Sequence, residues 1–257
     1  MTDEKAIRMK LTIIFPIKNQ ADKLIRNLHE EVLPYYDKSG LLYDVIIVND
    51  HSSEEESAKL EKAMEELPAH VRLIKNDGNP GKGGAVKKGI EEANGDYVLF
   101  MDCDLATDLK TTEGIKKDLG NYDAFFASRD LKQSVVNPKQ TFVRRIIHRL
   151  SRIRIRWQFH FKGISDTQCG FKAFKTSIAK EMAKRQIISG FAFDVEYCYF
   201  LQLNGYRIKD IPCRWRNDPD SSVKALKNSI NFMKDLRLIK KNKKNYILTP
   251  EEKEKLC

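Results

Sequence analysis

Two aspartates separated by one residue follow a short apolar stretch. Asp102 and Asp104 flank Cys103, directly after the apolar residues 97–101. Successive side chains alternate along an extended chain, so both carboxylates point to the same side. Carboxylate oxygens suit Mg²⁺ or Mn²⁺, which take the rest of their ligands from water and substrate phosphates. The pair therefore predicts a divalent-cation site at Asp102 and Asp104, with two solvated acids at a strand end as the alternative.

A glycine-rich segment with one lysine precedes a helical pattern. Residues 78–85 contain four glycines around Lys82. They have neither the Gly-Lys-Ser/Thr ending of a Walker A loop nor the spacing of a dinucleotide fingerprint. Glycines let a backbone approach a ligand closely, and a helix N-terminus presents N–H groups to an anion. The segment indicates a phosphate site with Lys82 and Gly83, or a plain glycine turn that enters a helix.

The first half of the chain alternates between apolar runs and segments with helical spacing. The apolar runs cover residues 11–15, 43–49, 71–75 and 97–101. This βαβα order predicts an α/β fold, a Rossmann-like and mostly parallel sheet with helices on both faces. Ligands of such sheets bind beyond the carboxyl ends of the strands, where Asp50 and Asp102 stand. Capping of the next helix by Asp50, Ser52 or Ser53 is the simpler alternative for Asp50.

The second half predicts basic amphipathic helices. Residues 142–162 have helical spacing, with Ile153 and Trp157 among the apolar residues on one side. Elsewhere on it lie Arg144, Arg145, Arg149, Arg152 and Arg156. Further elements are expected as helices over residues 193–203 and 223–233, a strand over 206–215, and a terminal helix after the capping-box pattern of Thr249 and Glu252.

The composition is that of a globular protein. With 257 residues, 41% hydrophobic and 32% charged, the chain is unlike disordered, collagen-like or solenoid proteins. The longest stretch without Asp, Glu, Lys or Arg is ten residues, 197–206, about half of what a membrane-spanning helix needs. The N-terminus does not resemble a secretory signal, and the five cysteines lack zinc-ligand spacing. We therefore expect a cytoplasmic protein with free thiols.

The net charge of +10 is concentrated in two segments. Residues 142–163 and 224–244 each carry +7, so the rest of the chain is acidic. A cationic helix with apolar and aromatic residues is typical of a helix lying on an anionic membrane surface; a core-packed helix with a solvated charged side is the alternative. A nucleic-acid-binding protein is a further interpretation, but no RNA or DNA motif is present, and we expect no nucleic-acid partner.

Taken together, the motifs resemble those of the family 2 glycosyltransferases of GT-A fold. They lie in residues 15–21, 48–53, 79–86, 101–107, 128–129, 166–172, 193–196, 215 and 221–224. The later motifs, above all Asp-Thr-Gln-Cys-Gly-Phe-Lys at 166–172, resemble the dolichyl-phosphate (polyprenyl-phosphate) β-glucosyltransferases. The resemblance covers about residues 10–225, so we expect a catalytic domain over residues 1–225 and a basic helical extension over 226–257. The chain departs from the usual family pattern at Lys18, Gln20, Asn49 and His51.

This resemblance implies an inverting transfer of a hexose, glucose by analogy, from a UDP-sugar to a polyprenyl phosphate at the cytoplasmic face of a membrane. It implies a cation, Mg²⁺ or Mn²⁺, on Asp102 and Asp104, and catalytic roles for Asp104, Arg129 and Asp166. The implied donor-nucleotide residues are Pro16, Asn19, Asp50, Lys82, Gly83 and Asp102. The implied acceptor-phosphate residues are Arg129 and Lys224, at motif positions, and Arg144 and Arg145, which rest on charge and location.

Asp166 has two interpretations, a catalytic base or a residue that orients its loop. An anionic phosphate acceptor needs no base, whereas a soluble or polymeric sugar hydroxyl would need one, from Asp166 or Asp194. For Asp194 we expect a structural role. A GT-A transferase with such a hydroxyl acceptor is the alternative function, and it would keep the same donor site.

Overall fold

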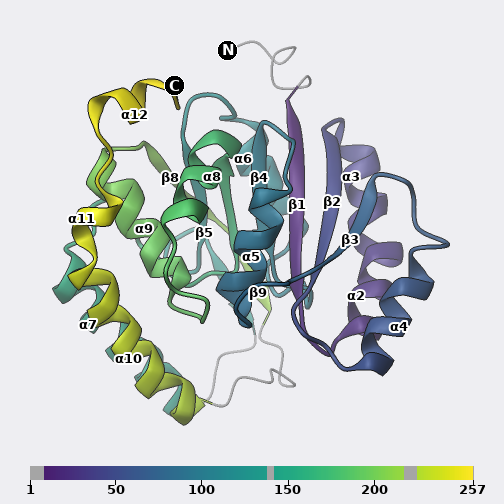
Figure 1. Ribbon diagram of the computed structural model, residues 1–257, viewed down its shortest axis with the longest axis horizontal. Coiled ribbons are helices and arrows are strands. Elements are labelled where there is room, and N and C mark those ends of the chain that lie inside the picture. Colours follow the sequence, from purple (N-terminus) through teal and green to yellow (C-terminus); the bar gives the residue numbers. More distant parts are fainter. Residues whose placement is uncertain (1–8, 138–141, 217–224, 257) are drawn as a thin grey trace.

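The centre of the fold is a seven-stranded sheet (Figure 1). The computed structural model describes residues 9–137, 142–216 and 225–256, and of residues 142–150 and 225–230 it describes the backbone. The strands of this sheet are β1 (Lys10–Ile17), β2 (Leu42–Asn49), β3 (Val71–Lys75), β4 (Tyr97–Met101), β5 (Ala124–Ser128), β7 (Phe171–Lys175) and β8 (Ile208–Pro212). Their order is β3-β2-β1-β4-β7-β5-β8.

The sheet is mostly parallel, as predicted. Only β7 runs antiparallel, to both of its neighbours β4 and β5. The four strands expected in the first half are β1 to β4. Every residue of β4 and of β5 is buried, as expected for strands that are covered on both faces. The α/β prediction is therefore confirmed.

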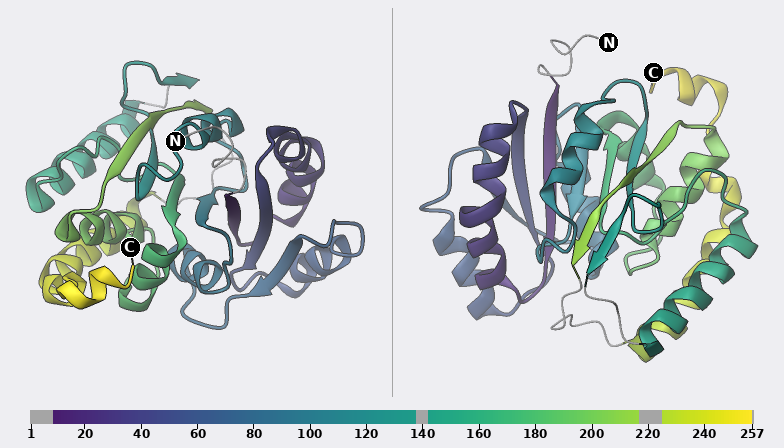
Figure 2. Two further views of the ribbon diagram at one scale, coloured as in Figure 1. Left: turned by 90° about the horizontal axis from the view of Figure 1, so that it is seen from above. Right: turned by 180° about the vertical axis from the view of Figure 1, so that it is seen from behind.

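Helices cover both faces of the sheet (Figure 2). On one face lie α2 (Ala21–Asn27), α3 (Leu33–Ser39), α4 (Glu54–Ala63) and α6 (Thr112–Lys116). On the other lie α5 (Lys82–Glu91), α7 (Phe142–Phe159), α8 (Thr176–Arg185), α9 (Phe193–Asn204), α10 (Ala225–Lys241) and α11 (Lys243–Tyr246). Neighbouring residues of one strand point to opposite faces. Ile13 therefore packs in the hydrophobic cluster on the α2 face, and Ile14 packs in the cluster on the α5 face.

Short segments complete the helical layers. A π-helical turn (Leu28–Val32) joins α2 to α3, and Gly40, in the left-handed conformation, ends α3. A 3-10 turn (Leu109–Thr111) precedes α6. The last helix, α12 (Pro250–Glu254), begins with the expected capping box of Thr249 and Glu252. That prediction is confirmed.

The strand expected over residues 206–215 is two strands, and this prediction is wrong in its extent. β8 ends at Pro212, and after Cys213 the chain forms β9 (Arg214–Arg216), which leaves the main sheet. There β9 pairs in parallel with β6 (Val135–Asn137). Proline has no N–H to donate to a ladder, so the edge strand ends at this residue. The break carries Trp215 away from the main sheet.

The C-terminal helices pack on the α5 side of the sheet. Leu236 and Ile239 of α10, Tyr246 of α11, and Leu248 belong to the hydrophobic cluster on that face. α10 begins at Ala225, next to the boundary expected at residues 225 and 226, and that division stays a prediction. Within the described ranges, no helix is both long and apolar enough to cross a membrane.

Candidate active site

The predicted carboxylate pair lies at the carboxyl end of β4, in the middle of the sheet. The backbone N–H of Asp102 donates to the carbonyl of Gly170 over 3.2 Å, which ties the end of β4 to the loop before β7. The Oδ1 atom of Asp104 accepts from the backbone N–H of Ala106 over 3.0 Å. Leu105, between these two residues, has a φ of 49°. This tight turn keeps both carboxylates at the edge of the sheet where ligands bind in such folds.

Lys82 is the direct partner of Asp102. Its Nζ lies 2.5 Å from Asp102 Oδ1, and the two side chains are 19% and 37% exposed. Burial would lower the pKa of the Lys82 ammonium, but the attraction of Asp102, Asp194 and Asp104 outweighs burial and raises that pKa. Lys82 is therefore a permanent positive charge beside the carboxylate pair.

The glycines around Lys82 are required by close packing within the chain. A Cβ on Gly81 would lie 2.4 Å from the carbonyl oxygen of Ser189, and one on Gly83 would lie 2.7 Å from that of Ile188. The Gly84 N–H donates to the carbonyl of Ser189 over 3.1 Å. The glycines thus leave room for the neighbouring backbone at Ile188 and Ser189. The phosphate site at Lys82 and Gly83 stays a prediction.

Asp50 binds this glycine turn and does not cap a helix. Its carboxylate accepts from the Gly81 N–H at 2.9 and 3.1 Å and from Asn76 Nδ2 at 2.8 Å. The cap of α4 is Ser53, whose hydroxyl accepts from the backbone N–H of Glu56. Two backbone N–H groups at the start of α5 thus donate to oxygens of the protein itself. That of Gly81 donates to Asp50, and that of Gly84 donates to the carbonyl of Ser189. A role of Asp50 toward a nucleotide base stays a prediction.

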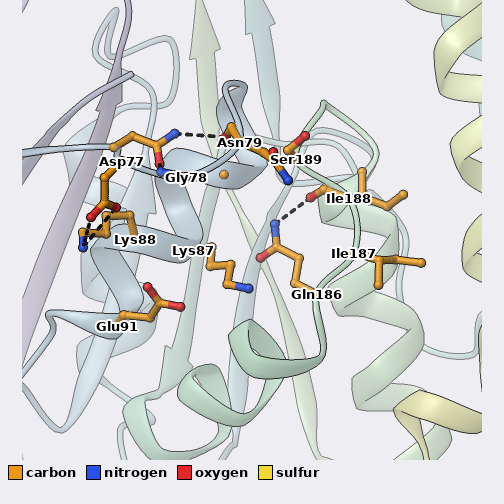
Figure 3. Close-up of a pocket in the computed structure, with 12 residues that line it drawn as sticks. Asp77, Gly78, Asn79, Lys87, Lys88, Glu91, Gln186, Ile187, Ile188 and Ser189 are labelled. Carbon is orange, nitrogen blue, oxygen red and sulfur yellow. Dashed lines mark hydrogen bonds and ion pairs between the residues drawn. The ribbon is translucent and has the colours of Figure 1, made fainter. Parts of the chain in front are cut away.

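A small cavity adjoins the same turn (Figure 3). It has a volume of about 200 Å³ and lies between residues 76–79, the outer side of α5 and residues 186–189. Gln186 fixes this arrangement, because its Nε2 donates to the carbonyls of Gly83 and Ile188. Glu196 also holds the segment, accepting from the N–H groups of Ile187 and Ile188. Burial raises the pKa of Glu196 to about 7.

Pro16 and Asn19 lie where β1 leaves the sheet. Pro16 pairs with Val48 of β2. Asn19 has a φ of 53°; its N–H donates to Ser52 Oγ and its Oδ1 accepts from the N–H of Ser53. These bonds hold the ends of β1 and β2 together, next to Asp50. The structure therefore brings the predicted donor residues to one edge of the sheet.

Arg129 and Asp166 form an ion pair. Arg129 Nε and Nη2 donate to the two carboxylate oxygens of Asp166 over 2.6 and 3.0 Å, and the guanidinium lies 5.5 Å from the centre of the Trp215 ring. Burial would raise the pKa of Asp166, but Arg129 outweighs burial and holds this pKa below its usual range. An ionised, fully bonded carboxylate is a poor proton acceptor. The geometry favours orientation of Arg129 and of the loop over a role of Asp166 as a base.

The other predicted acceptor residues cannot be placed. Lys224 lies outside the described residues, and the side chains of Arg144 and Arg145 lie outside the described part of α7. Their assignment to an acceptor phosphate stays a prediction.

Sequence reasoning missed the role of Lys172. This lysine has no exposed surface, and its Nζ donates to the carbonyl of Cys169 over 2.6 Å and to Asp194 Oδ1 over 2.8 Å. Asp194 is therefore the partner of a buried lysine, in line with the structural role expected for it. The available signal was a lysine between the apolar residues Phe171 and Ala173 of β7. Such a residue needs a buried partner.

A larger pocket is lined in part by Leu105, the chain neighbour of Asp104. It has a volume of about 530 Å³ and combines apolar side chains with cations. Its lining residues are Glu31, Tyr35, Leu105, Asp108, Leu109, Lys110, Val135, Asn137, Arg214, Trp215 and Arg216. Leu105 is the neighbour of Asp104, and Trp215 contacts Arg129, so the pocket adjoins both parts of the site.

The donor atoms fit a cation that arrives together with a phosphate ligand. Among the residues that the structure describes, no group of three or more His, Cys, Asp and Glu side chains is placed to hold a metal ion. Mg²⁺ needs only one or two protein carboxylates when water and substrate phosphates complete its shell. Asp102 and Asp104 can provide these, and the Asp102 carboxylate occupies the space that a Cβ on Gly170 would take.

Comparisons with known proteins agree on the family. The chain is 32% identical over 247 residues to a dolichyl-phosphate β-glucosyltransferase of Dictyostelium discoideum, covering 88% of this chain and 72% of the relative. The Homo sapiens enzyme of the same name is 28% identical over 252 residues, covering 90% and 75%.

Solved structures support the fold. Glucosyl-3-phosphoglycerate synthase of Mycobacterium tuberculosis in complex with UDP superposes with a TM-score of 0.68 at 14% identity, covering 96% of this chain and 84% of the other. The same enzyme with Mn²⁺ and UDP-glucose gives a TM-score of 0.66 at 12% identity, covering 97% and 85%. Residues 12–183 match the family model for Glycosyl transferase family 2. This chain has the GT-A fold, is a glycosyltransferase, and belongs to glycosyl transferase family 2.

Proposed function

We propose that this protein transfers glucose from UDP-glucose to a polyprenyl phosphate, with the help of a divalent cation. The observation that carries the proposal is a match to dolichyl-phosphate β-glucosyltransferases over about 90% of the chain. The arrangement of Asp102, Asp104 and Lys82 supports it, because a carboxylate pair beside a lysine suits a cation-bound diphosphate. The structural relatives crystallised with Mn²⁺ and UDP-glucose support the choice of donor and cation.

The donor would lie across the carboxyl ends of β1, β2 and β4, with its diphosphate at Asp102, Asp104 and Lys82. A bound divalent cation neutralises the negative charge that develops on the departing UDP. Lys82 adds a fixed positive charge at the same diphosphate. Asn19 and Asp50, which hold the ends of β1 and β2, would shape the position of the nucleoside.

The acceptor would occupy the 530 Å³ pocket beside Asp104. Lys110, Arg214 and Arg216 supply cations for a phosphate, while the apolar side chains in the lining, Trp215 among them, suit the first prenyl units. An anionic phosphate oxygen attacks the anomeric carbon as the bond from that carbon to UDP breaks, and UDP leaves with the electron pair. No proton is transferred, so the reaction does not need a base. The pairing of Asp166 with Arg129 is compatible with this route.

A transfer assay tests the donor and the acceptor together. Radiolabelled UDP- and GDP-sugars are supplied with Mg²⁺ or Mn²⁺ and either a short polyprenyl phosphate or a set of soluble sugars. We expect label from UDP-glucose to move into the organic phase with the polyprenyl phosphate. Label that enters only water-soluble products would discard the lipid-phosphate acceptor and return attention to Asp166 and Asp194 as bases.

We also propose that the protein binds an anionic membrane surface, at the cytoplasmic face, through α7. Among the described side chains of α7, Ile155 and Phe159 face the core, whereas Ile153 and Trp157 are 55% and 68% exposed. Of the two interpretations of this helix, the exposure of Ile153 and Trp157 supports the one on a membrane surface over the core-packed helix with a solvated charged side. Arg154 lies over the Trp157 ring at 5.1 Å. Exposed aromatic and cationic side chains on one helix suit a lipid surface.

Vesicle binding measures this membrane contact. We expect the wild-type protein to bind anionic vesicles more tightly than neutral ones, and less tightly as salt rises. Changing Ile153 and Trp157 together to Ser should weaken the binding about 30-fold or more, since two apolar side chains that leave water at about 1–2 kcal/mol each contribute about 2–4 kcal/mol. A matched control changes Leu42 and Ile247, which are also exposed, to Ser. Equal binding to neutral and anionic vesicles, or equal loss in the control, would rule out this surface.

A further inference from the structure

Lys82 occupies the side of Asp102 on which a cation would bind. Its Nζ is 2.5 Å from Asp102 Oδ1, so the ammonium already takes the place of a positively charged ligand on that oxygen. The lysine is the first residue of α5, and its backbone is fixed by the contacts of Gly81 and Gly84. Its side chain is largely buried and lies 5.9 Å from the centre of the Phe100 ring.

Asp102 has little freedom to turn away from Lys82. A Cβ on Gly170 would lie 2.0 Å from Asp102 Oδ2, so the second carboxylate oxygen is packed against the backbone of the loop before β7. Asp104 and Asp194 also attract the Lys82 ammonium. The lysine is thus held among three carboxylates, of which two are the predicted cation ligands.

We propose that Lys82 is a tethered counter-ion that makes cation binding at Asp102 dependent on the donor diphosphate. Without a diphosphate, the ammonium and a divalent cation compete for the same carboxylate and repel each other. A diphosphate carries enough negative charge to bind both the Lys82 ammonium and the divalent cation. The ammonium can then move to the phosphate oxygens while the cation binds Asp102. This inference rests on the proposed nucleotide-sugar donor. Because binding linkage is reciprocal, the cation and the nucleotide must strengthen each other's binding by the same factor.

Mn²⁺ binding without nucleotide tests the counter-ion directly. The probe is Mn²⁺ alone, with free Mn²⁺ followed by its electron paramagnetic resonance signal. We expect Lys82→Met to bind Mn²⁺ about tenfold more tightly than wild type, within the usual range of such couplings. Lys82→Arg keeps the charge and should bind Mn²⁺ as weakly as wild type, and circular dichroism checks that each variant is folded.

Lys88→Met is the matched control. It removes the same charge from α5, but the Lys88 ammonium pairs with Asp77 at 3.3 Å and with Glu92 at 3.8 Å, not with Asp102. It should leave Mn²⁺ binding as in wild type. If Lys82→Met binds Mn²⁺ no more tightly than Lys88→Met, the proposed counter-ion role is overturned.

UDP then tests the coupling. Saturating UDP should tighten Mn²⁺ binding to the wild-type protein about tenfold. In Lys82→Met, the tightening of Mn²⁺ binding by UDP should be much smaller. Equal tightening in both proteins would overturn the coupling. A wild-type protein that binds Mn²⁺ but not UDP would instead overturn the proposed donor, while the comparison with Mn²⁺ alone still decides whether Lys82 competes with the cation.

Discussion

Changing Asp104 to Ala should lower glucosyl transfer about 1,000-fold while leaving the fold intact. Asp104 is one of two carboxylates at the end of β4, and its loss leaves Asp102, already paired with Lys82, as the remaining predicted ligand. Neutralising charge on a leaving diphosphate contributes several kcal/mol to the transition state, and about 4 kcal/mol corresponds to a factor of about 1,000. The backbone turn that Asp104 supports through the Ala106 N–H is short, so we expect little change in stability.

The measurement is kcat/KM over a range of Mn²⁺ concentrations, together with the thermal unfolding midpoint. Asp77→Ala serves as the control, because Asp77 is an exposed carboxylate that pairs with Lys88 away from β4. It should keep wild-type activity. A fully active Asp104→Ala protein would remove Asp104 from the site, and a loss of activity that excess Mn²⁺ restores would mean that Asp104 contributes affinity for the cation only.

Much of the fold could be predicted because its signals are local. Apolar runs of about five residues, separated by helical spacing, are typical of a parallel sheet with helices on both faces, and β1 to β4 lie where these runs are. The direction of β7 could not be predicted. Its run Phe-Lys-Ala-Phe-Lys fits either direction, since the pairing with β4 and β5 depends on how the chain returns to the sheet.

In the site, residue types could be predicted better than contacts. The spacing of Asp102 and Asp104 indicates a cation site, and that site stays a prediction. The bond from Asp50 to Gly81 and the pair of Arg129 with Asp166 join residues 31 and 37 positions apart, and no sequence pattern specifies such partners. As a result, the partners of the glycine turn could not be predicted, and Asp166 stayed open between two roles.

Helix α7 illustrates the limit of periodicity. The 3.6-residue spacing locates the helix correctly, but it assumes one apolar strip facing the core. Here Ile155 and Phe159 face the core while Ile153 and Trp157 face outward. Two strips on one helix give a pattern that a single amphipathic face does not explain, and the outward strip is the part that the proposed membrane contact would use.

Changing Gly170 to Ala should lower kcat/KM about 100-fold, although Gly170 carries no functional group. The new Cβ would lie 2.0 Å from Asp102 Oδ2 and 2.5 Å from its Cγ, distances that atoms in proteins do not adopt. The Asp102 N–H donates to the Gly170 carbonyl, so the two residues cannot separate without losing that bond. The carboxylate must therefore turn, and a misplaced group near the reacting atoms commonly costs about 100-fold.

A double-mutant cycle separates this cause from a general loss of packing. Gly170→Ala should lower the free energy of unfolding in the wild-type background, but much less when Asp102 is also changed to Ala, because the clashing carboxylate is then absent. Gly190→Ala is the control, since a Cβ there would make an ordinary contact, 3.5 Å from Asp235 Oδ2. If Gly170→Ala destabilises both backgrounds equally, the clash with Asp102 is not the cause, and the loop before β7 positions the site in some other way.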